Sequence, residues 1–119
     1  MKKILIVEDN DDIRFLYKRM FRKETDIELE ETASAEAALE SIPKIHPDLA
    51  IIDISLPGIS GIDLTKKVHN LYPGIRILVV TGHDTARYYE YAINNGADDL
   101  VSKEIGKDIV NKCRRMLDI

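Results

Sequence analysis

Five polar residues of this chain stand at the ends of short apolar runs and have side chains suited to metal and phosphate chemistry. They are the carboxylates Glu8, Asp9 and Asp53, the hydroxyl of Thr81 and the amine of Lys103. Carboxylates that lie together repel one another, and such a cluster persists more easily when a cation sits among them. Oxygen ligands without a nearby His or Cys favour Mg²⁺, with Mn²⁺ as the alternative. An ammonium and a hydroxyl beside that ion suit a bound phosphoryl group.

The apolar runs themselves predict the strands of a parallel sheet. Residues 4–7, 49–52 and 75–80 are short and apolar, as expected of strands that are buried on both faces. Residues 27–31 alternate apolar and acidic side chains, which is typical of an edge strand, and residues 100–101 are the weakest candidate. The sequence therefore predicts five strands.

The segments between these strands have the periodicity of helices. Ser34 is a candidate N-cap for the second helix and Pro43 its expected end, while Gly96 suits the end of the fourth. The expected helices cover residues 11–20, 35–42, 62–71, 85–95 and 109–117. Strict alternation of strands and helices predicts a doubly wound α/β fold, whose ligands bind beyond the carboxyl ends of the strands. The five polar residues are expected to converge there.

Composition limits the classes of protein to which the chain can belong. Its 119 residues suit a single domain, and a formal net charge of −4 argues against nonspecific binding to nucleic acid. The single cysteine, Cys113, excludes an internal disulfide framework and fits a reducing compartment. The first apolar run is too short for a signal peptide or a membrane span. We therefore expect a cytoplasmic protein without membrane contact.

Four short motifs together resemble the receiver domains of two-component response regulators. They are Glu8-Asp9 after Val7, Asp53 to Pro57 with Gly58 and Gly61 beyond, Thr81-Gly82, and Ser102-Lys103. The resemblance spans the whole chain and implies one receiver domain over residues 1–119, without an output domain. It also implies a (βα)5 flavodoxin-like sheet with strand order 2-1-3-4-5. Lys103-Glu104, with Tyr72-Pro73-Gly74 and Asn95 to Asp98, is similar to receivers of transcription factors that carry a helix-turn-helix domain.

The resemblance also implies a role for each site residue. Asp53 is the expected phosphoacceptor, which takes a phosphoryl group from a sensor histidine kinase or a histidine phosphotransfer protein. Asp9 and Asp53 would bind Mg²⁺ directly, Glu8 mainly through water, and Ser55 through its backbone carbonyl. Lys103 and Thr81 would contact the phosphoryl oxygens. Such a domain catalyses only its own phosphorylation and dephosphorylation.

The chain departs from the family pattern at two positions. Leu100 replaces the aromatic residue that usually couples phosphorylation to output, and Glu104 replaces the proline that often follows the site lysine. The usual output face consists of the fourth helix, the fifth strand and the fifth helix. Three tyrosines on the fourth helix, Tyr88, Tyr89 and Tyr91, suit contact there with a downstream protein, a fused output domain or a second copy.

Other interpretations remain open at this point. Thr81 can simply cap the fourth helix, and Lys103 can be an ordinary solvated lysine. The chain as a whole could be a small Mg²⁺-dependent phosphatase with an aspartyl nucleophile, or a degenerate receiver that serves as a binding module. The sequence names neither the kinase nor the target, and leaves open whether the receiver acts alone or within a transcriptional regulator.

Overall fold

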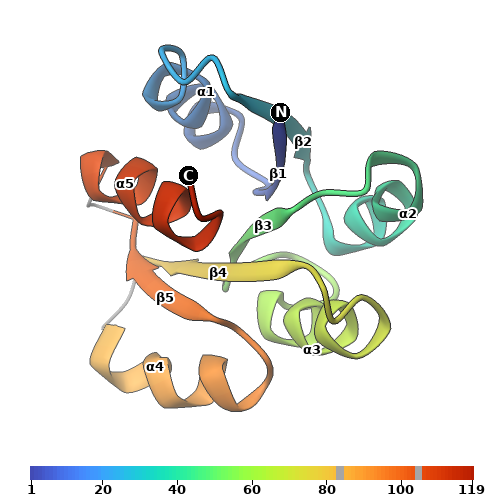
Figure 1. The fold of residues 1–119 in the computed structure, drawn as a ribbon. Coiled ribbons are helices and arrows are strands. Elements are labelled where there is room, and N and C mark those ends of the chain that lie inside the picture. The colour runs from blue at the N-terminus through green and yellow to red at the C-terminus, as the bar shows by residue number, and fades with distance from the viewer. Residues whose placement is uncertain (83–84, 104–105) are drawn as a thin grey trace.

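The computed structural model describes residues 1–82, 85–103 and 106–119, within which five strands and five helices alternate along the chain (Figure 1). The strands are β1 (Lys2–Val7), β2 (Ile27–Thr32), β3 (Leu49–Asp53), β4 (Arg76–Thr81) and β5 (Asp99–Ser102). The helices are α1 (Asp11–Met20), α2 (Ala35–Ile45), α3 (Gly61–Leu71), α4 (Thr85–Asn94) and α5 (Gly106–Met116). The predicted alternation is confirmed.

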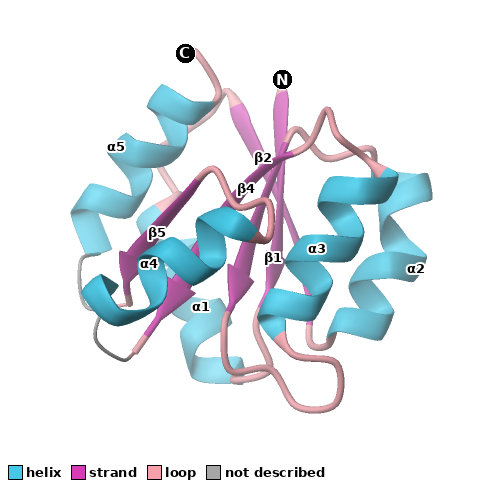
Figure 2. Cartoon of the chain, turned by 90° about the horizontal axis from the view of Figure 1, so that it is seen from below, coloured by secondary structure: helices cyan, strands magenta, loops and turns pink. Residues whose placement is uncertain are grey.

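The strands form one parallel sheet in the order β2-β1-β3-β4-β5, which confirms the predicted topology. From β1 the chain first adds β2 on one side and later adds β3 on the other. The strand order therefore reverses beside β1, where ligands of such sheets bind. Figure 2 shows the strands pointing toward the same edge of the molecule. The residues that follow β1, β3, β4 and β5 are thereby brought to one edge.

Each face of the sheet has its own apolar core. Leu5 and Val7 of β1 face helices α2, α3 and α4, whereas Ile4 and Ile6 face α1 and α5. These four side chains are at most 1% exposed, as expected of a strand that is covered on both faces. Burial of this kind stabilises a domain by roughly 25 cal/mol per Å² of apolar surface, so β1 is firmly held just before the acidic pair.

Side chains on the preceding loops cap three of the helices. Asn10, Ser34 and Ser60 each accept a hydrogen bond from the backbone N–H three residues later, all at 3.1 Å. The prediction that Pro43 ends the second helix is wrong, because α2 continues to Ile45. Pro43 lies in the last turn and removes the hydrogen bond that a backbone N–H there would donate to the carbonyl of Leu39, and the helix ends two residues later. The left-handed backbone of His46, with φ of 53°, ends α2 instead.

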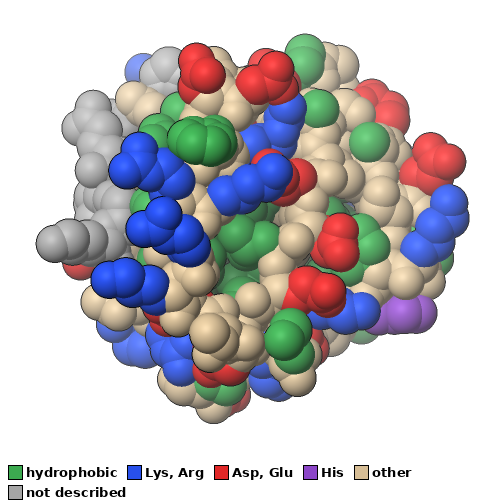
Figure 3. Space-filling model, turned by 90° about the horizontal axis from the view of Figure 1, so that it is seen from above, with side chains coloured by type: hydrophobic (Ala, Val, Ile, Leu, Met, Phe, Trp, Pro, Cys, Tyr) green, Lys and Arg blue, Asp and Glu red, His purple; other side chains and the backbone are tan. Residues whose placement is uncertain are grey.

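Charged side chains cover the outer surface of the helices. Figure 3 views the molecule from the α1 side and shows Lys and Arg interspersed with Asp and Glu on the same face. Several of them pair, and Arg114 of α5 holds Asp26 before β2 with two contacts of 2.9 and 3.0 Å. In the part of the chain that the structure describes, no helix combines the length and hydrophobicity needed to cross a membrane.

Candidate phosphoacceptor and metal site

Three carboxylates meet at the carboxyl edge of the sheet. Glu8 and Asp9 leave the end of β1, and Asp53 is the last residue of β3, which pairs with β1. One oxygen of each carboxylate lies within 4.8 Å of the others. Glu8 and Asp53 are only 2% exposed, whereas Asp9 faces solvent. A divalent cation approaching from solvent would therefore meet Asp9 first and two buried carboxylates behind it.

Lys103 lies against both buried carboxylates. Its Nζ is 2.9 Å from Oε1 of Glu8 and 2.9 Å from Oδ2 of Asp53. The backbone N–H of Lys103 donates to the carbonyl of Thr81 at 3.0 Å, which extends the β4–β5 pairing and aims the side chain at the cluster. Burial lowers the pKa of Lys103, but its contacts with Glu8 and Asp53 raise that pKa by more. The ammonium therefore stays charged.

Glu8 is the most constrained of the three acids. Burial raises the pKa of Glu8, and the charge of Asp53 adds to this rise, while hydrogen bonds from Lys103 and the Asn10 backbone oppose it. The buried Oε1 of Glu8 forms the ion pair with Lys103. Among the described residues it accepts no hydrogen bond of good geometry. A buried carboxylate oxygen with unused capacity is a natural acceptor for a metal-bound water.

The two oxygens of Asp53 have different partners. Oδ1 accepts a hydrogen bond of 3.1 Å from the backbone N–H of Ser55, and Oδ2 faces Lys103. The backbone N–H of Ile54 donates to Val80 at 2.9 Å, so the turn after Asp53 stays attached to β4. Ser55 lies two residues beyond Asp53 and is exposed, which leaves its backbone near the cluster open to solvent.

Gly61 lies over the backbone of Asp53. A Cβ atom at Gly61 would lie 2.7 Å from Cα of Ile54 and 2.8 Å from the carbonyl carbon of Asp53, and nearer still to the Asp53 oxygen. The backbone N–H of Gly61 also donates to the Ile54 carbonyl at 3.3 Å. Gly61 entered the sequence analysis only as part of the motif that follows Asp53, where a glycine is first expected to shape the loop. Its close approach is a second reason for glycine there, and no sequence pattern reveals it.

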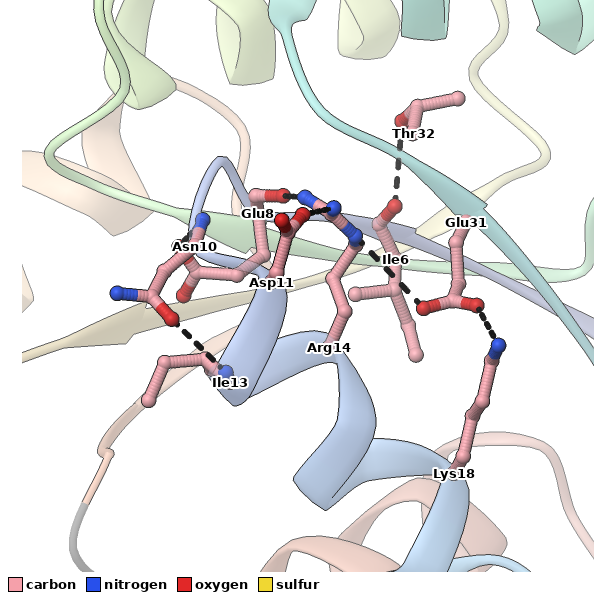
Figure 4. A network of polar contacts seen from close by, with 9 residues as sticks. All are labelled: Ile6, Glu8, Asn10, Asp11, Ile13, Arg14, Lys18, Glu31 and Thr32. Carbon is pink, nitrogen blue, oxygen red and sulfur yellow. Dashed lines mark hydrogen bonds and ion pairs between the residues drawn. The ribbon is translucent and has the colours of Figure 1, made fainter.

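Sequence reasoning also missed Arg14. Its guanidinium Nη1 donates to the backbone carbonyl of Glu8 at 2.6 Å, from the second turn of α1 (Figure 4). The same side chain pairs with Asp11 and lies 3.8 Å from Glu31 of β2. The helical pattern placed position 14 beside the apolar stripe of Ile13 and Tyr17, but it gave no sign of the acceptor.

The remaining predicted residues lie where the topology requires. Thr81 is the last residue of β4, which pairs with the strand that carries Asp53, and it is fully buried. Leu100 is 5% exposed in the core under α4, and Tyr89 and Tyr91 are about half exposed on α4. Tyr88 is partly buried, and the Arg87 guanidinium lies 5.6 Å from its ring centre. The Lys103–Glu104 peptide bond lies outside the described residues.

Several known proteins with related sequences are described as regulatory proteins. Residues 4–113 match the family described as "Response regulator receiver domain". The chain is 38% identical over 103 residues to the regulatory protein VanR of Enterococcus faecium, covering 85% of this chain and 43% of that one. It is 29% identical over 106 residues to the transcriptional regulatory protein DegU of Brevibacillus brevis, covering 88% of this chain and 45% of that one. The chain thus spans about half the length of these relatives.

Solved structures share the fold over nearly the whole chain. A CheY-like response regulator receiver domain protein from Methanospirillum hungatei JF-1 has a TM-score of 0.90 and 34% identity, covering 99% of this chain and 94% of that one. A putative response regulator from Chloroflexus aurantiacus has a TM-score of 0.88 and 30% identity, with 99% and 98% coverage. With the family match over residues 4–113, this chain belongs to the response regulator receiver domains of two-component systems.

Proposed function

We propose that this receiver is a phosphorylation-dependent switch that accepts a phosphoryl group on Asp53, with Mg²⁺ as cofactor. The observation that carries the proposal is the grouping of three carboxylates within 4.8 Å, with Lys103 2.9 Å from two of them. A purely structural metal site would gain little from an ammonium that competes for its ligands. A site for a phosphoryl group needs both the metal and the ammonium.

The donor set suits a hard cation. Asp9 and Asp53 would bind Mg²⁺ directly, Glu8 through water, and Ser55 through its backbone carbonyl, with Mn²⁺ as the alternative ion. The buried Oε1 of Glu8 supports this assignment, since beside its ion pair with Lys103 it can accept a hydrogen bond from a metal-bound water. When bound, the ion would neutralise charge on the transferring phosphoryl group.

Asp53 would act as a carboxylate nucleophile. One of its oxygens forms a bond to phosphorus as the bond from phosphorus to a donor histidine nitrogen breaks, and the imidazole leaves with the electron pair. Lys103 would exchange its contact with Asp53 for the phosphoryl oxygens, and Thr81 would donate a hydrogen bond to them. Water later hydrolyses the acyl phosphate. We propose no catalysis beyond this self-phosphorylation and dephosphorylation.

The phosphodonor would be a sensor histidine kinase or a histidine phosphotransfer protein in the cytoplasm. A sporulation initiation phosphotransferase of Bacillus subtilis is 34% identical over 82 residues, which supports a place in a phosphorelay. Relatives described as transcriptional regulators are about twice as long as this chain. Residues 1–119 would therefore form one receiver domain, either standing alone or serving as the receiver part of such a regulator.

The output would pass through the face made by α4, β5 and α5. Exposed Tyr89 and Tyr91 suit contact with a downstream protein, a fused output domain or a phosphorylated second copy. Leu100 lacks the ring of the usual switch residue, so the signal would travel through Thr81 and the loop that follows it. We expect no direct contact of this domain with nucleic acid or membrane.

Intact mass spectrometry after incubation with acetyl phosphate tests the proposal. We expect one phosphoryl adduct that hydroxylamine removes, and no adduct with Asp53→Asn or in EDTA. Beryllofluoride binding, followed by NMR, is the second measurement. If neither the adduct nor beryllofluoride binding appears in the presence of Mg²⁺, the switch proposal fails and the chain is a binding module of receiver fold.

A further inference from the structure

Arg14 joins three acceptors around the acidic loop that follows β1. Its Nη1 donates to the backbone carbonyl of Glu8 at 2.6 Å, while the same guanidinium pairs with Asp11 and approaches Glu31 at 3.8 Å. The Arg14 side chain is 19% exposed, so most of it is held against the protein. Figure 4 shows the guanidinium between the end of β1, the start of α1 and the end of β2.

The Glu8 carbonyl belongs to the peptide unit that joins the two acids. Because a peptide unit is planar, the direction of the Glu8 carbonyl also sets the direction in which the chain enters Asp9. The Glu8 N–H donates to the Thr32 carbonyl at 3.1 Å, and Oε2 of Glu8 accepts from the Asn10 N–H at 3.2 Å. The hydrogen bond from Arg14 therefore supplies the constraint on the Glu8–Asp9 peptide itself.

We infer that Arg14 is a positioning residue, which holds the Glu8–Asp9 peptide so that both carboxylates point toward one divalent cation. The inference rests on the proposed metal site and extends it to a residue outside the acidic cluster. A planar guanidinium offers five donors in a rigid fork and so fixes the relative positions of its acceptors, whereas an ammonium offers three donors that rotate on a flexible stem. Arg14 would thus determine how well the apo protein is preorganised for Mg²⁺.

The charge of Arg14 and its positioning role should change the Mg²⁺ affinity in opposite directions. A cation near a metal site repels the metal, so removal of the Arg14 charge should tighten Mg²⁺ binding if charge alone matters. Loss of positioning has the opposite effect and weakens binding. The sign of the change in affinity therefore distinguishes the two effects.

Lys18 provides a matched control in the same network. Its Nζ pairs with Glu31 at 2.9 Å, and its side chain is 61% exposed (Figure 4). Lys18→Gln removes the same unit of charge from the same helix, but leaves the hydrogen bond between Arg14 and Glu8 in place. Arg14→Lys keeps the charge and removes the fork of donors.

The experiment is a Mg²⁺ titration of the full chain followed by amide chemical shifts, with the melting temperature measured in EDTA. We expect Arg14→Gln to weaken Mg²⁺ binding by about tenfold, the lower end of the effect of losing an outer-sphere partner. Arg14→Lys should lose less but stay weaker than the wild type. Lys18→Gln should bind as tightly as the wild type or slightly more tightly.

The controls separate the inference from the proposed function. If the wild type binds no Mg²⁺ in this titration, the proposed metal site itself fails. If the wild type binds but a folded Arg14→Gln variant binds equally or more tightly, only the positioning role is overturned. Should Arg14→Gln not fold, Arg14→Lys decides, because an affinity equal to that of the wild type would overturn the role.

Discussion

Substitution of Gly61 by Ala tests whether the contact between α3 and the backbone of Asp53 matters. The added Cβ would lie 2.7 Å from Cα of Ile54 and 2.8 Å from the carbonyl carbon of Asp53. These atoms belong to the backbone, so no side-chain rotation relieves the overlap. Either the start of α3 or the turn after Asp53 has to move. The same substitution at Gly74 is a matched control, because within the described residues no atom lies within 4 Å of a Cβ there.

The expected loss follows from two opposing effects. Overpacking of a tight site costs roughly 1–3 kcal/mol. Alanine is a better helix former than glycine by at most about 1 kcal/mol, and less at the first residue of a helix. We expect Gly61→Ala to lower the free energy of unfolding by about 1–2 kcal/mol. Gly74→Ala should be neutral, or stabilise by up to about 1 kcal/mol through the unfolded state.

The same displacement should slow phosphorylation. A shift of about 1 Å at a reacting group can lower its rate about 100-fold, and Gly61 contacts the backbone that carries the Asp53 carboxylate. Urea unfolding followed by circular dichroism measures the stability, and intact mass against time with acetyl phosphate measures the rate. If Gly61→Ala matches Gly74→Ala in both measurements, the close contact has no consequence and the reasoning is refuted.

Three further predictions concern charge and burial. Lys103→Met should lower the free energy of unfolding in EDTA by about 3 kcal/mol, the lower end for a broken buried ion pair, because two buried carboxylates lose a partner that is itself partly exposed. Saturating Mg²⁺ should reduce this loss, and an equal loss with and without Mg²⁺ contradicts the prediction. The hydrogen bond from Arg114 lowers the pKa of Asp26, so this contact should stabilise the fold above the ordinary pKa of Asp. The stabilisation should disappear as pH falls through the lowered pKa. In urea unfolding, Arg114→Gln should lose that part of the acid dependence. Burial raises the pKa of Cys113 to about 12, so iodoacetamide should label this thiol only as fast as the protein opens. Rapid labelling of the folded protein, measured by mass, would contradict its burial.

The sequence predicted the fold well because the signals of a parallel sheet are local. Apolar runs such as residues 49–52 are short, and each is followed by polar residues, which leaves few alternatives to buried parallel strands. The end of the second helix was predicted wrongly at Pro43. Proline removes one helical hydrogen bond and its ring crowds the carbonyl four residues earlier, which weakens a helix without always ending it at once. Here α2 continues for three residues beyond the predicted end, to Ile45.

Strand order predicts the position of some site residues, whereas others are found only in the three-dimensional structure. Glu8, Asp53 and Lys103 follow strands whose carboxyl ends share one edge, so their proximity follows from strand order alone. Arg14 could not be found in this way. A helical pattern tells which face of α1 is buried, but a long flexible side chain reaches several acceptors from one face, and the Glu8 carbonyl has no sequence signature.

The charge balance of the site gives a physical reason for the proposed metal requirement. With every group ionised, three carboxylates and one ammonium leave two negative charges at a site where one oxygen of each carboxylate lies within 4.8 Å of the others. A phosphodonor also carries negative charge, and at such distances like charges repel strongly in a partly buried site. In the structure, the ammonium of Lys103 is already paired with Glu8 and Asp53. Under the proposed function, Asp9, Asp53 and Glu8 would hold a divalent cation that cancels this charge, and Lys103 would then be able to turn to the phosphoryl oxygens, so we expect metal binding to precede phosphoryl transfer.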